Sequence, residues 1–195
     1  MKVTPANNRR MVMISIANIS LLFLLTLARI NAVGLDTVAD YGLHMIDEIS
    51  YLTMLWYLVS IIQFTGESIS VQTPFSIFLG LQLVNYICSF TALFGMLIEG
   101  LGILMGVITI YVAVYAFHVK HKMIKSGFRI LGVALFGSIL LKFSLAFLPI
   151  TSGRHHPSPG VFIGFIDLIP VLAILYIILQ VNNLLKTTSQ ISTNP

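Results

Sequence analysis

The sequence contains few charged residues. Asp, Glu, Lys and Arg make up 9% of its 195 residues, whereas hydrophobic residues make up 57%. Soluble domains average about 25% charged residues. With a mean hydropathy of +0.95, the chain is too apolar to include a separate soluble domain. Its composition indicates an integral membrane protein with the lipid bilayer as its main partner.

The usual signatures of catalysis are also missing. The single cysteine, Cys88, lies inside an apolar run, which excludes a disulfide framework and a cysteine metal cluster. The sequence has no nucleophile elbow, no phosphate-binding glycine loop and no paired-histidine protease motif. No cofactor is indicated, and enzymatic function lacks a positive argument.

The excess of positive charge does not indicate nucleic-acid binding. The net charge is +4, and eight of the eleven Lys and Arg residues lie in three places: Lys2, Arg9 and Arg10; Lys120, Lys122, Lys125 and Arg129; and Lys186. Aromatic residues of the kind that stack on bases are not interleaved with them. We interpret these residues as markers of the cytoplasmic side of a membrane protein.

Long apolar runs make up most of the chain. A transmembrane helix needs about 20 apolar residues, and the chain has room for six. We therefore predict an all-α fold with a single transmembrane domain over 1–195, in which 182–195 is a flexible polar tail. The predicted spans are 11–33, 49–64, 74–97, 101–117, 128–149 and 161–181. The third and fourth spans form one run, which we expect to turn at Glu99–Gly100.

The most basic connection, 119–129, determines the predicted orientation. If this connection is cytoplasmic, both termini are cytoplasmic as well. The acidic segment 34–48, with four of the seven acidic residues, then lies on the opposite side. The second span is short, which indicates either little tilt or a helix that begins earlier, within the acidic segment.

The last two spans each contain one charge inside the apolar region. At about 1.5 Å per residue, Lys142 and Asp167 lie roughly 10 Å from the same membrane face, so an antiparallel hairpin lets them meet. Such residues indicate an ion or proton path, or a counter-ion for a polar substrate. A salt bridge that fixes helix register is an equal alternative, and Lys142 pairing with Glu99 or the acidic segment is a third. Ser138 and Pro170 add a polar neighbour and a kink beside the two charges.

The third span contains a polar stripe. Gln82, Asn85 and Ser89 recur at spacings of three and four residues and therefore share one helix face. A stripe of this kind faces other helices, where it can form interhelical hydrogen bonds. Alternatively, it lines a polar cavity together with Lys142 and Asp167.

Two glycine pairs have the spacing of close helix contacts. Gly102 and Gly106 lie in the fourth span, and Gly160 and Gly164 lie in the sixth. Because small residues let helix backbones approach each other, we expect another helix to pack on both pairs.

A cluster of histidines and acids is expected on the side opposite the basic connection. It comprises His44, Asp47, Glu48, Glu99, His155 and His156. Imidazole and carboxylate groups can bind zinc, manganese or iron, although the spacing is not that of a paired-histidine zinc motif. A solvated acidic face, or a docking site for a partner, would use the same residues.

Three classes of function follow from these features. The first is a small transporter or channel component that moves an ion or small solute past Lys142 and Asp167. The second is a non-catalytic structural subunit of a larger membrane complex, whose partners are other membrane subunits or further copies of the chain. The third is a membrane enzyme that uses the His/acid cluster.

Overall fold

The computed structural model describes residues 1–30, 37–91, 95–147 and 159–192, and these residues form six α-helices. The helices are α1 (Pro5–Ile30), α2 (Thr37–Phe64), α3 (Ile69–Thr91), α4 (Gly95–Ala116), α5 (Lys125–Phe147) and α6 (Pro159–Ser192). The predicted all-α fold is confirmed.

Five of the helices in the described part of the chain are long and apolar enough to cross a membrane. The sixth, α4, contributes a shorter apolar stretch over Gly100–Ala116. This pattern is compatible with a multi-pass membrane protein. The orientation of the loops and termini stays a prediction.

The break between α3 and α4 lies earlier in the sequence than the turn that we predicted. Helix α3 ends at Thr91 and α4 begins at Gly95, so Glu99 and Gly100 lie inside α4 rather than in a turn. Glu is a good helix former, and one Gly costs a helix only about 1 kcal/mol, so neither residue needs to break it.

Helices α2 and α6 exceed their predicted spans by the largest margins. Helix α2 has 28 residues and includes the acidic residues from Asp40 onward, so the helix begins within the acidic segment. Helix α6 has 34 residues and continues through 182–192, where we predicted a flexible tail. Buried Val181 and Leu185 lie one turn apart, which extends the packed face of α6 beyond the predicted end of the span.

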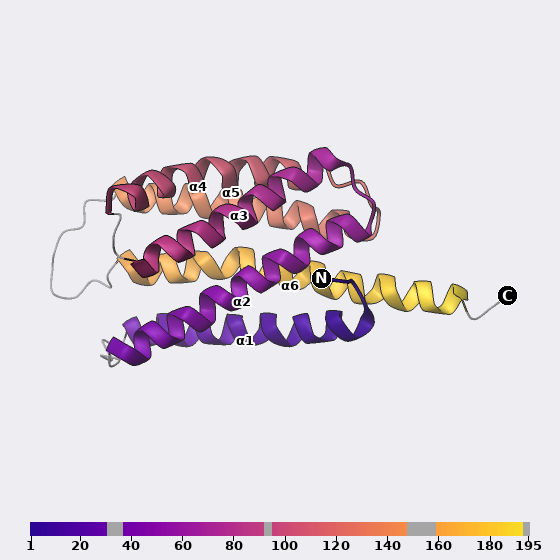
Figure 1. Cartoon of the computed structure of the whole chain (residues 1–195), viewed down its shortest axis with the longest axis horizontal. Helices are drawn as coiled ribbons and strands as arrows, with labels where there is room; N and C mark the ends of the chain where they lie inside the picture. Colours follow the sequence, from indigo (N-terminus) through magenta and orange to yellow (C-terminus); the bar gives the residue numbers. More distant parts are fainter. Residues whose placement is uncertain (31–36, 92–94, 148–158, 193–195) are drawn as a thin grey trace.

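The six helices form a closed ring in sequence order. Each helix packs against the next one along the chain, and α6 packs against α5 and α1 and, over a smaller area, against α2. Successive helices run antiparallel (Figure 1). We call the end with the turn 65–68 and the connection 117–124 the closed end. The other end, where α1, α3 and α5 finish and α2, α4 and α6 begin, is the cavity end.

Buried apolar side chains are concentrated in the closed half of the ring. The largest fully buried ones include Met11, Met54, Tyr57, Leu58, Ile61, Ile62, Ile124, Phe128, Leu131, Ile174, Ile177 and Ile178. Phe75 and Phe128 meet edge to face, with their ring centroids 5.7 Å apart. These side chains form one packed cluster that joins the helices in this half.

A buried polar bridge joins three helices inside the same half. The Tyr57 hydroxyl of α2 donates a hydrogen bond to Asn8 Oδ1 of α1 over 3.0 Å. Asn8 Nδ2 in turn donates to the carbonyl oxygen of Ile178 in α6 over 3.1 Å. Asn8 and Tyr57 are fully buried, so the bridge fixes the mutual register of α1, α2 and α6.

Glu67 ties the two connections of the closed end together. It lies in the tight turn between α2 and α3, where Gly66 adopts φ +68°. The buried Glu67 side chain accepts hydrogen bonds at Oε1 from the backbone N–H groups of Lys120 (2.9 Å) and His121 (2.7 Å). The basic connection between α4 and α5 is therefore held against the α2–α3 turn.

The surroundings of three of the four paired glycines are described, whereas those of Gly160 lie outside the described part of the chain. A Cβ atom on Gly164 would lie 2.5 Å from Thr26 Oγ1, so the close contact predicted for Gly164 is confirmed and joins α6 to α1. The contact predicted for Gly102 and Gly106 is wrong, because a Cβ atom on either would meet no atom within 4 Å. Both glycines instead line a cavity.

Candidate functional site

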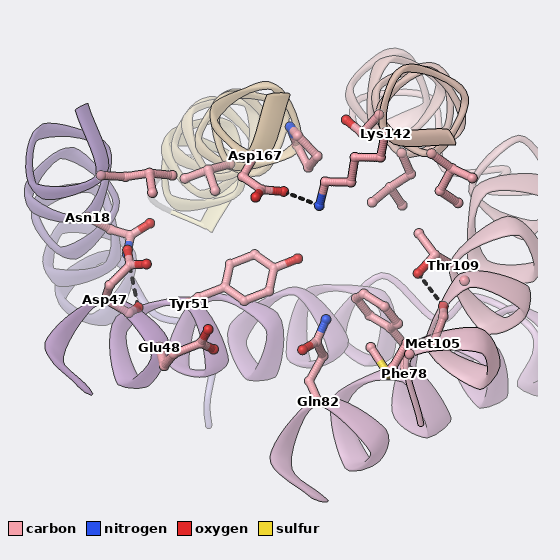
Figure 2. A pocket seen from close by; sticks show the side chains of 18 residues that line it. Asn18, Asp47, Glu48, Tyr51, Phe78, Gln82, Met105, Thr109, Lys142 and Asp167 are labelled. Atoms are coloured by element: carbon pink, nitrogen blue, oxygen red, sulfur yellow. Dashed lines mark hydrogen bonds and ion pairs between the residues drawn. The ribbon is translucent and has the colours of Figure 1, made fainter. Parts of the chain in front are cut away.

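The ring of helices surrounds a partly open cavity of about 390 Å³, and all six helices contribute residues to its wall (Figure 2). The polar lining residues are Asn18, Asp47, Glu48, Tyr51, Gln82, Thr109, Ser138, Lys142 and Asp167. Most of these residues lie nearer the cavity end than the apolar core does. The packed apolar core and the polar cavity therefore occupy different halves of the ring.

The two charges of the last hairpin meet on the cavity wall. Lys142 Nζ of α5 lies 2.5 Å from Asp167 Oδ1 of α6. Their side chains are 43% and 41% exposed, so the pair borders open space instead of lying in packed core. One turn before Lys142, the buried Ser138 hydroxyl donates a long hydrogen bond of 3.4 Å to the carbonyl oxygen of Ile166.

Asn18 of α1 contributes a buried polar group on another part of the wall. Its Nδ2 donates hydrogen bonds to the Asp47 backbone oxygen (3.1 Å) and to Asp47 Oδ1 (2.7 Å). The side chain of Asn18 is 1% exposed, yet its Oδ1 has no hydrogen-bond partner in the described part of the chain. A buried acceptor without a donor costs about 1–3 kcal/mol, and this oxygen has almost no accessible surface through which a molecule in the cavity could donate to it.

Glu48, Tyr51 and Gln82 surround the same space. Figure 2 shows the Tyr51 hydroxyl pointing into the cavity above the Gln82 amide, with Glu48 beside Asp47 on α2. Within the described residues, no hydrogen bond or ion pair occupies the Glu48 carboxylate, the Tyr51 hydroxyl or the Gln82 amide. These groups are free to contact a solute.

The charges around the cavity do not balance. Three carboxylates, those of Asp47, Glu48 and Asp167, line the same space as one ammonium group, that of Lys142. An isolated charge at the centre of a membrane helix costs about 2.5–3.5 kcal/mol on the insertion scale. An excess of negative charge inside an apolar ring therefore favours the entry of a positive group.

The cavity joins residues that we assigned to two separate clusters. Lys142, Asp167, Gln82 and Ser138 were expected within the membrane, whereas Asp47 and Glu48 were expected at its outer surface. The longer α2 explains the difference, because Asp47 and Glu48 lie well inside the helix and not in a surface segment.

The other candidate residues lie elsewhere. Asn85 is not part of the cavity wall, although it shares a helix face with Gln82. His44 Nε2 lies 3.8 Å from Asp40 Oδ1, and both side chains are substantially exposed. The side chain of Glu99 lies outside the described residues, as do His155 and His156.

The arrangement of the His/acid cluster bears on the metal-site interpretation. Of its described members, His44 pairs with Asp40 whereas Asp47 and Glu48 line the cavity. In the described ranges, no three His, Cys, Asp or Glu side chains lie close enough together to hold a metal ion. The predicted combination of imidazole and carboxylate ligands is thus divided between two places.

Sequence reasoning missed Asn18, Tyr51 and Thr109. Asn18 could have been found, because it is a strongly polar residue near the middle of an apolar run. Thr109 gives a weaker signal, since its hydroxyl donates to the Met105 carbonyl oxygen of its own helix over 2.6 Å. A hydroxyl satisfied in this way is common in membrane helices. Tyr51 resembles an ordinary packing aromatic in the sequence.

Comparison of the chain with known protein families, with characterised proteins and with solved structures finds no match.

Proposed function

We propose that this protein is a small membrane transporter or channel component that binds an ion or small polar solute in the six-helix cavity. The observation that supports this proposal is the cavity itself, a polar space to which every helix of an otherwise apolar ring contributes. Its volume of about 390 Å³ falls within the range of about 300–1,000 Å³ that is typical of small-molecule sites.

The cost of the polar groups supports the same proposal. Ionisable residues within membrane helices are rare and commonly mark solute paths. Here four of them, Asp47, Glu48, Lys142 and Asp167, line one cavity. A salt bridge needed only for helix register would require Lys142 and Asp167, but it would not require two further carboxylates on α2.

Movement of the solute to the other side requires a change at the closed end. The apolar core lies between the cavity and that end, and the bridge from Tyr57 through Asn8 to Ile178 links three helices there. Alternating access needs a barrier on each side of the site in turn. We assign the closed end the role of one barrier and orient it toward the cytoplasm, because it includes the basic connection.

Flux through reconstituted protein tests this proposal. The native chain and Asp167→Asn are compared in liposomes with Na⁺, K⁺, H⁺ and methylammonium as probes. We expect Asp167→Asn to abolish the flux that the native chain supports, because the carboxylate on the path is lost while the side-chain volume is kept. Size-exclusion chromatography checks that the variant still assembles.

The matched control is Asp40→Asn, which makes the same chemical change on α2 outside the cavity. It should leave flux unchanged. Normal flux in Asp167→Asn, or equal loss in both variants, would count against a path at the Lys142–Asp167 pair.

A further inference from the structure

The cavity also indicates which kind of solute it takes. We propose that it binds a small organic cation with a primary ammonium group, for which Glu48 supplies the counter-charge and Tyr51 and Gln82 supply hydrogen-bond acceptors. This inference rests on the proposed function, since it names the class of solute that the same site would hold.

The charge that is not already paired lies on α2. The Lys142 ammonium group is neutralised by Asp167 at 2.5 Å. The Asp47 carboxylate accepts one hydrogen bond from the Asn18 amide at Oδ1, while the second bond from Asn18 goes to the Asp47 backbone oxygen. The Glu48 carboxylate lines the cavity without an ion pair or hydrogen bond in the part of the chain that the structure describes. A cation that enters the cavity therefore finds Glu48 as its available counter-charge.

The hydrogen-bonding groups around this carboxylate favour a ligand that donates. The ionised Glu48 carboxylate on the cavity wall can only accept hydrogen bonds. The Tyr51 hydroxyl and the Gln82 amide oxygen offer two more acceptors on the cavity wall. A primary ammonium group has three N–H donors, enough to reach Glu48 and two neutral oxygens at once. A quaternary ammonium group has none.

The size and the apolar part of the wall favour an organic cation over a bare metal ion. The cavity volume is about 390 Å³, whereas a water molecule takes up about 30 Å³. The apolar lining includes Leu22, Phe78, Met105, Leu135, Ile139 and Val171. Figure 2 shows Phe78 and Met105 across the cavity from Asn18 and Asp47. A ligand with an ammonium head and a short hydrocarbon body would match both sides.

The aromatic rings add to this match. Phe78 and Tyr51 both border the space, and an ammonium group over an aromatic face is attracted by its electrons. The paired Lys142 lies close to this space (Figure 2), but its charge is balanced by Asp167 and repels a cation far less than an unpaired lysine would.

Ligand binding to the full chain in lipid nanodiscs tests the inference without any measurement of flux. The probes are n-butylammonium and phenethylammonium, their N,N,N-trimethyl counterparts, and neutral n-butanol, each followed by calorimetry. We expect the primary ammonium ions to bind at least about tenfold more tightly than the trimethyl forms, because only they donate charge-assisted hydrogen bonds. Glu48→Gln should weaken this binding by about tenfold or more, whereas Asp40→Asn should not.

The comparison of probes on the native chain does not depend on whether Glu48→Gln folds. Equal affinity for primary and trimethyl forms, unchanged binding in folded Glu48→Gln, or no heat from any ammonium probe would each overturn the inference. Binding of an ammonium probe without flux would support the inference on the solute and contradict the transport function. Flux of a neutral or anionic solute without ammonium binding would support the transport function and overturn the inference that the solute is an ammonium ion.

Discussion

At the scale of single residues, the Lys142–Asp167 pair poses a choice between two roles. A pair that only fixes helix register and a pair on a solute path share the same geometry, so the 2.5 Å contact does not distinguish them. They differ in what happens when both charges are removed together. Removing one partner of an ion pair strands the other charge, whereas removing both can leave stability nearly intact.

We therefore predict different outcomes for stability and flux in a double-mutant cycle. Lys142→Met strands Asp167 on the cavity wall and should lower the free energy of unfolding by roughly 1–3 kcal/mol. The double variant Lys142→Met/Asp167→Asn should recover most of that loss but remain without flux. Thermal unfolding in detergent and liposome flux provide the two readouts. Recovery of both would indicate a purely structural pair.

At the scale of elements, the contact between α1 and α6 is what makes the arrangement a ring. Gly164 allows this contact, because its missing side chain leaves room for Thr26 of α1. Small residues at such contacts let helix backbones approach closely in membranes. Without this approach the first and last helices would separate at the level of the cavity, whose wall includes Asn18 and Leu22 of α1 and Asp167 of α6.

Gly164→Ala tests the close contact between α1 and α6. The added Cβ would lie 2.5 Å from Thr26 Oγ1, and crowding of this kind costs typically about 1–3 kcal/mol. We expect a lower unfolding temperature, partly restored by Thr26→Ala in the same chain. Gly80→Ala is the matched control, since a Cβ there meets nothing within 4 Å. It should be neutral or slightly stabilising. Equal changes in unfolding temperature for Gly164→Ala and Gly80→Ala would argue against a close α1–α6 contact at Gly164.

The elements also show how far the sequence alone determines this fold. Apolar runs give the number and type of the helices, because backbone polar groups in a bilayer must be satisfied within each segment. Helix ends are not determined in this way: the acid at 99 and the glycine at 100 suggested a turn, yet α4 begins at Gly95. The cavity was only partly predictable, since Asp47 and Glu48 join it through packing of α2 against distant segments of the chain.

At the scale of the whole molecule, the protein is asymmetric from end to end. The closed end has a packed apolar core, the Tyr57–Asn8 bridge and the basic connection held by Glu67. The other half contains the cavity. If the positive-inside rule applies, the half with the packed core faces the cytoplasm. The acidic cavity then lies in the half of the membrane nearer the opposite side. A cation would then reach Glu48 from outside without crossing the core.

Cysteine labelling of intact cells tests this orientation. On a Cys88→Ser background, Tyr41→Cys adds a thiol at an exposed position near the cavity end, and Lys122→Cys adds one at an exposed position in the basic connection. A membrane-impermeant maleimide should label Tyr41→Cys at once and Lys122→Cys only after permeabilisation. The reverse pattern would place the cavity half toward the cytoplasm, and the basic residues would then require a different explanation, such as binding of anionic lipid headgroups. Labelling of both thiols in intact cells would show that the chain does not adopt one orientation.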